Sequence, residues 1–198
     1  MNQFTTKELR ALKSLRNPAG IQRFLEDIPY HHASTAWSPR LVLQHRAAHC
    51  LEGALFAAAA LRVNGFPPLV WDLEGYRDDD HVVALFRVKK HWGAIGKSNF
   101  SGLRYREPVY RSLRELAMSY FDDYFNLAGD RSLRRFATRP VNLSQFDKRD
   151  WTTSNVGLWY IAEHLCEVAH TRMLTPAMES TLIRVDARRK AAGFVGRQ

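Results

Sequence analysis

Residues 47–65 read AAHCLEGALFAAAALRVNG, a run of small and apolar side chains that begins beside a cysteine and ends at a glycine. Alanine and leucine are strong helix formers, and a glycine with two prolines just beyond it is a typical stop signal. We therefore expect a buried helix over residues 48–64 with Cys50 in its first turn. Unpaired backbone N–H groups and the helix dipole favour a thiolate there, so the sequence predicts a Cys50 pKa below the ordinary value of about 8.5.

The hydrophobic pattern changes after this helix. Residues 69–74, 81–88 and 92–99 are short stretches rich in β-branched and aromatic side chains, which is typical of strands. Because successive strands with short connections pair antiparallel, we expect an α+β fold in which the cysteine helix packs on an antiparallel sheet. Helical signals define the other predicted helices, and Pro140 marks one further strand as an edge or broken strand. These helices cover residues 7–16, 17–27, 38–44, 111–126, 158–169 and 175–190, and the further strand covers residues 136–143.

The length and composition of the chain fit one domain. Its 198 residues are 45% hydrophobic, which is enough for a full core. We expect a single domain over residues 1–198, with a core at about 36–143 and helical extensions at 1–35 and 155–192. Two cysteines give no disulfide framework, and no apolar segment is long enough to span a membrane, so we expect a cytoplasmic protein with no membrane partner. The net charge of +9 attracts anionic partners.

His81 is the candidate general base, at the start of the strand predicted over residues 81–88. If the hairpin turn is centred on Lys90, the residue numbers of cross-strand partners sum to 180, so His81 lies opposite Asn99. The Asn99 side chain could then accept a hydrogen bond from the imidazole and fix its tautomer. A turn centred half a residue earlier presents Ser98 instead, because a one-residue slip reverses the face of the strand.

These residues resemble the core of transglutaminase-like and papain-like cysteine enzymes. The likeness covers about residues 40–110: Cys50 opens an Ala-rich helix, a Gly-Phe-Pro turn follows that helix, and His81 begins a strand with a polar residue on the next. It implies a Cys50–His81–Asn99 triad, since the third member is usually Asp in the transglutaminase-like branch and Asn in the papain-like branch. Papain-like enzymes also place an oxyanion-binding Gln six residues before the nucleophile. Gln44 stands at this offset from Cys50.

Other candidate site residues have simpler explanations. Asp72 is an alternative orienting group for the imidazole, although its place in a strand indicates a surface position. His49 is expected to be a surface residue at the helix N-terminus. Cys166 and His170 share a helix face but lack a second ligand pair, and residues 78–80 lack the alternating spacing of a calcium loop. We therefore expect neither a metal ion nor a cofactor.

Two classes of function follow. In the first, Cys50 attacks the carbonyl of a peptide, amide or ester substrate and forms a thioester, which makes the protein a peptidase, an amidase or a transglutaminase-type acyltransferase. In the second, the same fold is a non-catalytic binding module for an acidic protein or a nucleic acid, although the sequence has no motif that reads bases. The basic residues available for such a partner are Arg184, Arg188, Arg189, Lys190 and Arg197.

Overall fold

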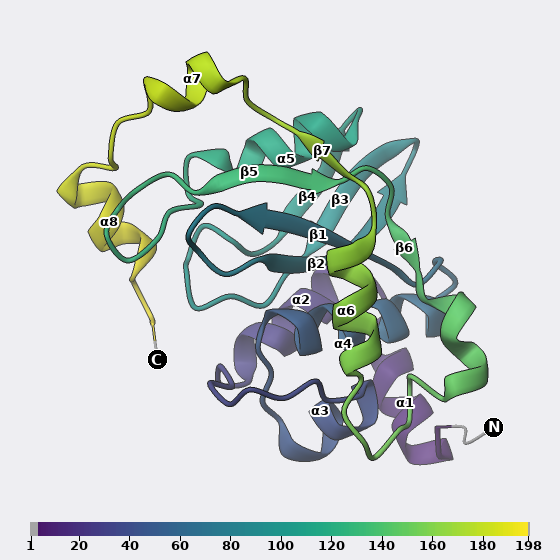
Figure 1. Ribbon diagram of the computed structural model, residues 1–198. Coiled ribbons are helices and arrows are strands. Elements are labelled where there is room, and N and C mark those ends of the chain that lie inside the picture. The colour runs from purple at the N-terminus through teal and green to yellow at the C-terminus, as the bar shows by residue number, and fades with distance from the viewer. Residues whose placement is uncertain (1–3, 198) are drawn as a thin grey trace.

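A seven-stranded antiparallel sheet forms the centre of the molecule in the computed structural model, which describes residues 4–197 (Figure 1). Its strand order is β4-β3-β2-β1-β5-β7, and β6 pairs with β1. The predicted α+β class is confirmed. The strands are β1 (Leu69–Gly75), β2 (His81–Val88), β3 (His91–Ile95), β4 (Arg106–Tyr110), β5 (Leu133–Ala137), β6 (Val141–Asn142) and β7 (His170–Arg172).

The predicted cysteine helix is present as α4 (Cys50–Val63), and it is the most deeply buried helix of the fold. Every residue from 51 to 61 is buried. His49 is the N-cap, with Glu52 three residues later, and the helix stops before Gly65, whose φ of 89° suits glycine. Helix α4 packs on β1 and β2. The sulfur of Cys50, the first residue of α4, lies 3.9 Å from the carbonyl oxygen of Asp80, just before β2.

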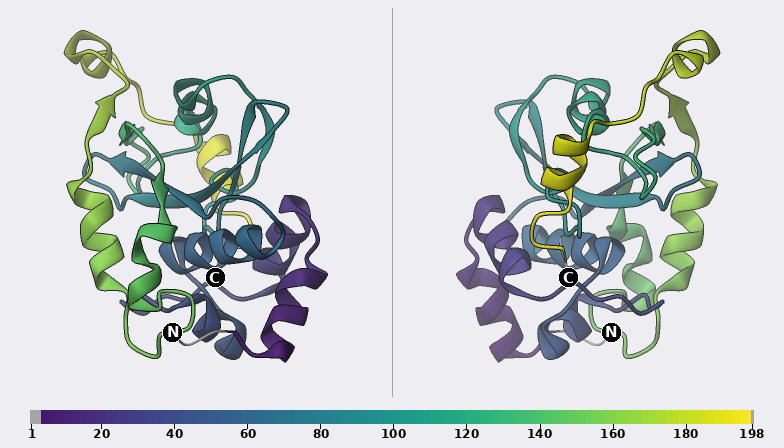
Figure 2. Two further views of the ribbon diagram at one scale, coloured as in Figure 1. Left: turned by 90° about the vertical axis from the view of Figure 1, so that its right-hand side faces the viewer. Right: turned by 90° about the vertical axis from the view of Figure 1, so that its left-hand side faces the viewer.

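Helices cover both faces of the sheet (Figure 1, Figure 2). Helices α1 (Thr6–Ser14), α2 (Pro18–Asp27) and α3 (Pro39–His45) pack around α4, and α6 (Trp159–Glu167) contacts β1. Helix α5 (Leu113–Phe121) covers the other face, against β3, β4 and β5. None of the helices within residues 4–197 has the length and apolar character needed to cross a bilayer.

The β2–β3 hairpin has the alternative register of the sequence analysis, with its turn centred half a residue before Lys90, and not the register that places His81 opposite Asn99. Ala84 pairs with Ile95, where the predicted register pairs it with Gly96. The reason is a two-residue turn in which Lys89 and Lys90 both have positive φ, as in a type I′ turn. Pairing with β2 stops at Ile95, so β3 is shorter than the predicted strand over residues 92–99.

After Ile95 the chain turns away from β2 and bonds to α2. Gly96 exchanges two hydrogen bonds of 3.1 Å with the side-chain amide of Gln22. The Lys97 ammonium then donates to the carbonyls of Leu25 (2.8 Å) and Ile28 (2.5 Å). These polar contacts replace the ladder bonds that a longer β3 would make.

The C-terminal third departs most from the sequence expectations. The predicted strand over residues 136–143 is two strands, β5 and β6, separated at Pro140, as a proline break requires. The predicted helix over residues 175–190 is two short ones, α7 (Pro176–Ser180) and α8 (Ala187–Gly193). Strand β7 was not predicted, and residues 143–149 form a short 3-10 helix. Strand β4, in the middle of the chain, was not predicted either.

Candidate active site

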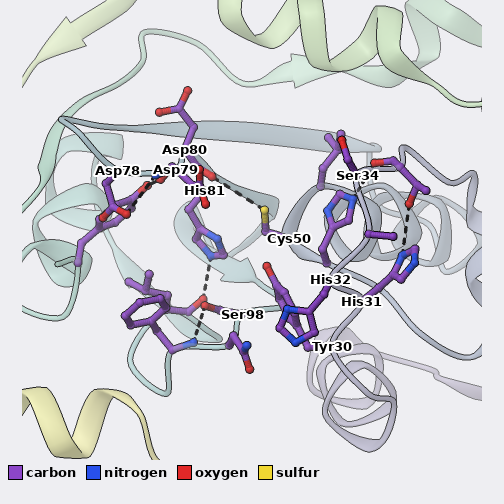
Figure 3. A pocket seen from close by; sticks show the side chains of 18 of the residues that line it. Tyr30, His31, His32, Ser34, Cys50, Asp78, Asp79, Asp80, His81 and Ser98 are labelled. Atoms are coloured by element: carbon purple, nitrogen blue, oxygen red, sulfur yellow. Dashed lines mark hydrogen bonds between the residues drawn. The ribbon is translucent and has the colours of Figure 1, made fainter. Parts of the chain in front are cut away.

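Cys50 is the first residue of α4 and is half-buried. Its Sγ atom lies 3.9 Å from the Asp80 carbonyl oxygen, and the backbone N–H groups of Val82 and Leu51 also interact with the sulfur. Asp80 and Val82 flank His81 in the chain. The sulfur therefore lies against the main chain on both sides of the candidate base (Figure 3).

His81 is the first residue of β2 and is only 5% exposed. Its Nε2 atom lies 2.8 Å from the carbonyl oxygen of Leu103, and its ring packs edge-on against Tyr120 and Tyr124. A carbonyl oxygen only accepts hydrogen bonds, so Nε2 carries the proton and donates it. The Nδ1 atom of the neutral ring is then an acceptor, which is what a general base needs.

Cys50 and His81 line one cleft of about 460 Å³ (Figure 3). Its walls include the loop that begins at Tyr30, the first turn of α4, the β1–β2 loop and the segment after β3. The volume is in the range of a small-molecule or peptide side-chain site. The lining residues that matter below are Tyr30, His31, Thr35, His49, Asp78, Asp79, Asp80, Ser98, Asn99 and Tyr124.

Burial makes both reactive groups neutral at rest. It raises the pKa of the Cys50 thiol to about 11, a rise that the negative charges of Asp72 and Asp79 reinforce. It also lowers the pKa of His81 to about 4, and the nearby Arg106 charge acts in the same direction. The expectation that the helix N-terminus lowers the thiol pKa is therefore wrong, because desolvation exceeds the stabilisation by backbone N–H groups.

The sequence analysis assigned the orienting role to Asn99, with Ser98 as the alternative. Both are buried and line the cleft, but neither is a cross-strand partner of His81, because the chain leaves the sheet after Ile95. The Ser98 hydroxyl oxygen accepts a hydrogen bond from the Phe100 N–H at 3.0 Å. The Leu103 carbonyl bonds to the imidazole instead.

Gln44 and Asp72 lie outside the cleft lining. Gln44 is exposed on α3, so it does not reach the oxyanion position that the papain-like offset implied. Asp72 is buried, not on the surface, and its Oδ2 atom lies 3.0 Å from Nε2 of His170. Burial and the Asp80 charge raise the pKa of Asp72 to about 7. This carboxyl belongs to a separate buried Asp–His pair.

The acidic β1–β2 loop stabilises its own turn. Asp78 accepts hydrogen bonds from the Ser132 hydroxyl at 2.5 Å and the Asp79 N–H at 3.1 Å, and Asp80 accepts one from the Gly75 N–H at 2.9 Å. Within residues 4–197, no group of three or more His, Cys, Asp or Glu side chains is placed to hold a metal ion.

Glu52 holds the loop after Tyr30 against the first turn of α4, and the sequence analysis missed this residue. Its side chain is fully buried. One carboxylate oxygen accepts from the Thr35 hydroxyl (2.5 Å) and the Trp37 N–H (3.0 Å), and the other accepts from Nδ1 of His31 (3.0 Å) and the His49 N–H (3.1 Å). The spacing of Glu52 three residues after an N-cap is a capping-box signal that could have revealed it.

The same network corrects the expectation for His49, which is half-buried and not a surface residue. Its Nε2 atom donates to the Thr35 carbonyl at 2.8 Å. The His31 ring stacks between those of Trp37 and His49, with centroid distances of 3.9 and 6.1 Å. The loop over the cleft is thus joined to the first turn of α4 by hydrogen bonds and ring contacts.

A thiol and an imidazole that share a cleft are the components of a cysteine-nucleophile site. No known family model matches this sequence, and no curated protein matches it. The functional argument therefore depends on the geometry of the residues themselves.

The two cysteines should differ in their reaction with iodoacetamide. Cys166 is exposed on α6, whereas a shift of the Cys50 pKa from 9.0 to about 11 lowers its thiolate fraction about 100-fold at neutral pH. We expect Cys166 to be alkylated first at pH 7.5 in the folded protein, the reverse of the sequence expectation. Cys50 should react tenfold faster per pH unit until about pH 11. Peptide mapping after timed alkylation measures both rates, and a Cys50 rate that levels off below pH 8 would contradict the neutral thiol.

Proposed function

We propose that the protein is a cysteine-dependent acyl-transfer enzyme with a transglutaminase-like or papain-like core, acting on a peptide, amide or ester. One observation carries the proposal: the Cys50 sulfur lies against the main chain at Asp80 and Val82, and the Nε2 proton of the intervening His81 is bonded to the Leu103 carbonyl, which leaves Nδ1 as the basic nitrogen. The helix-on-sheet packing and the shared cleft support it.

The chemistry starts from a neutral thiol and a neutral imidazole. Cys50 Sγ attacks the substrate carbonyl carbon, the thiol proton passes to Nδ1 of His81, and the carbonyl π electrons move to oxygen. The hydrogen bond from Nε2 to the Leu103 carbonyl stabilises the imidazolium that forms. When the tetrahedral intermediate collapses, its bond to the leaving amine or alkoxide breaks. His81 returns the proton to that group, leaving a thioester on Cys50.

A second acceptor completes the reaction. Water or an amine attacks the thioester while His81 takes its proton, and the same imidazole returns that proton to the sulfur. With water the protein is a peptidase or amidase, and with an amine it is a transglutaminase-type enzyme. Both outcomes use the same two side chains.

Trapping the thioester tests this function. The Cys166→Ser variant leaves Cys50 as the only thiol, and an activated ester should add one acyl group per chain. Intact-mass spectrometry should detect the adduct, and hydroxylamine should remove it. The matched Cys50→Ala, Cys166→Ser protein should give no such adduct. If the folded single-thiol protein is alkylated but never acylated, the enzyme proposal is wrong.

That outcome would favour the non-catalytic binding module. Its basic surface near the C-terminus is partly neutralised, because Arg184 pairs with Asp130 at 2.7 Å and Arg189 pairs with Asp123 at 3.1 Å. Exposed ion pairs of this kind are weak, so an acidic partner could still compete for the arginines.

A further inference from the structure

The proposed reaction needs a second hydrogen-bond donor for the oxyanion. The backbone N–H of Cys50 is the first, because N–H groups in the first turn of a helix have no partner within the helix. Gln44, the side chain that the papain-like spacing suggested, is exposed on α3 and outside the cleft lining. A second donor can instead come from another side chain in the cleft.

Tyr30 lies where this donor is needed. Its hydroxyl interacts with the Cys50 main chain, and Figure 3 shows its side chain extending toward Cys50. A parallel bridge between Tyr30 and Ala48 sets the distance to α4, with hydrogen bonds of 3.1 Å from the His31 N–H to the Ala48 carbonyl and 3.3 Å from the Ala48 N–H to the Pro29 carbonyl. The His32 ring packs edge-on against Tyr30, 5.2 Å between centroids.

Two other polar side chains of the cleft donate their protons to backbone carbonyls. Tyr124 donates toward the carbonyls of Leu73 and Asp79. The Nε2 proton of His49 goes to the Thr35 carbonyl at 2.8 Å. The Tyr30 hydroxyl, next to the N–H of the nucleophile itself, is well placed to donate to the same substrate oxygen.

Resting on the proposed function, we infer that Tyr30 is the second oxyanion donor, a catalytic residue that pairs its O–H with the backbone N–H of Cys50. At rest, the Cys50 N–H bonds to the Tyr30 oxygen. When the substrate oxygen accepts this N–H instead, it lies beside the Tyr30 O–H, which rotates to donate to it. Burial and the neighbouring Cys50 raise the pKa of Tyr30, so the phenol keeps its proton throughout the neutral range. The developing negative charge then meets two hydrogen-bond donors, the Cys50 N–H and the Tyr30 O–H.

The test compares two reactions of the same sulfur in the Cys166→Ser background. Acylation by p-nitrophenyl acetate builds an oxyanion, whereas alkylation by iodoacetamide does not. Tyr30→Phe removes one oxygen atom and keeps the ring. It should slow acylation about 100-fold or more, as loss of one oxyanion donor does, while alkylation changes less than about threefold. The ratio of the two rates cancels any shift in the thiol pKa.

Tyr160→Phe is the matched control, because it removes a phenol hydroxyl on α6 that lies outside the cleft and has no hydrogen-bond partner within residues 4–197. Its ratio of acylation to alkylation should equal that of the Cys166→Ser parent. An unchanged ratio in Tyr30→Phe would overturn the role of Tyr30 and leave the acyl-transfer function intact. A parent protein that is alkylated but not acylated would overturn the function and the inference together.

Discussion

Replacing His81 with glutamine should lower the rate of thioester formation roughly 100- to 10,000-fold, the usual contribution of a positioned general base. The resting thiol has a pKa of about 11, so almost none of it is ionised at neutral pH, and attack requires a base that accepts the proton. Glutamine can still donate an N–H to the Leu103 carbonyl in place of Nε2, but it offers no basic nitrogen in place of Nδ1. Single-turnover acylation of Cys50, followed by mass spectrometry, measures the loss.

The control for this variant is His91→Gln. His91 lies on β3, and its Nδ1 atom is bonded to the Lys89 carbonyl at 3.0 Å, away from the cleft. This variant should acylate at the rate of the parent protein. Melting curves for both variants separate a chemical effect from unfolding. A folded His81→Gln protein with unchanged acylation would remove His81 from the mechanism.

Glu52→Gln should destabilise the fold by about 3 kcal/mol, because each carboxylate oxygen accepts two hydrogen bonds in a fully buried position. An amide has one acceptor oxygen, so its NH₂ group must face two of the four donors. Burial opposes ionisation, but the hydrogen bond from Thr35 and the His49 charge outweigh it and lower the pKa of Glu52 below 4.5. Urea unfolding followed by tryptophan fluorescence measures the difference.

The pH dependence distinguishes this effect from a packing loss. A carboxyl whose pKa is lowered by folding contributes its full stability above its ordinary value of 4.5 and loses it as the pH falls through the folded value. The difference in unfolding free energy between the wild type and Glu52→Gln should therefore have its full size above about pH 5.5 and become smaller in acid. Glu115→Gln is the control, since Glu115 is exposed and accepts from the Arg111 N–H at 2.7 Å. It should cost less than about 1 kcal/mol.

The sequence was sufficient for the parts of the fold that depend on local periodicity. The start of α4 at Cys50 and the strands β1 and β2 follow from side-chain type and spacing. Strand β4 has the sequence REPVY, in which two charged residues and Pro108 are unfavourable for a strand, so its sequence does not indicate one. Strand β7 has three residues, and its pairing with β5 is a tertiary contact that no local pattern records.

The candidate site was predicted in part, and its errors share a physical cause. Cys50 and His81 line one cleft, as their order and context indicated. The preferred hairpin register was wrong, and the alternative register is the one observed, because Lys89 and Lys90 adopt positive φ in a two-residue turn that their residue type does not indicate. The Leu103 carbonyl was missed because a backbone acceptor has no sequence signature. The thiol pKa was wrong because desolvation depends on the surroundings that three-dimensional packing creates.

The alanines at residues 57–60 limit how this chain can vary. All four side chains are at most 1% exposed, and cores packed to this density admit extra methylene groups only with backbone shifts. These positions lie about two to three helical turns from Cys50, on the same rigid α4. A larger residue that displaces α4 from β2 moves the sulfur relative to His81 without touching the cleft. Tolerance to mutation should therefore be as low along this inner helix as among the cleft residues themselves.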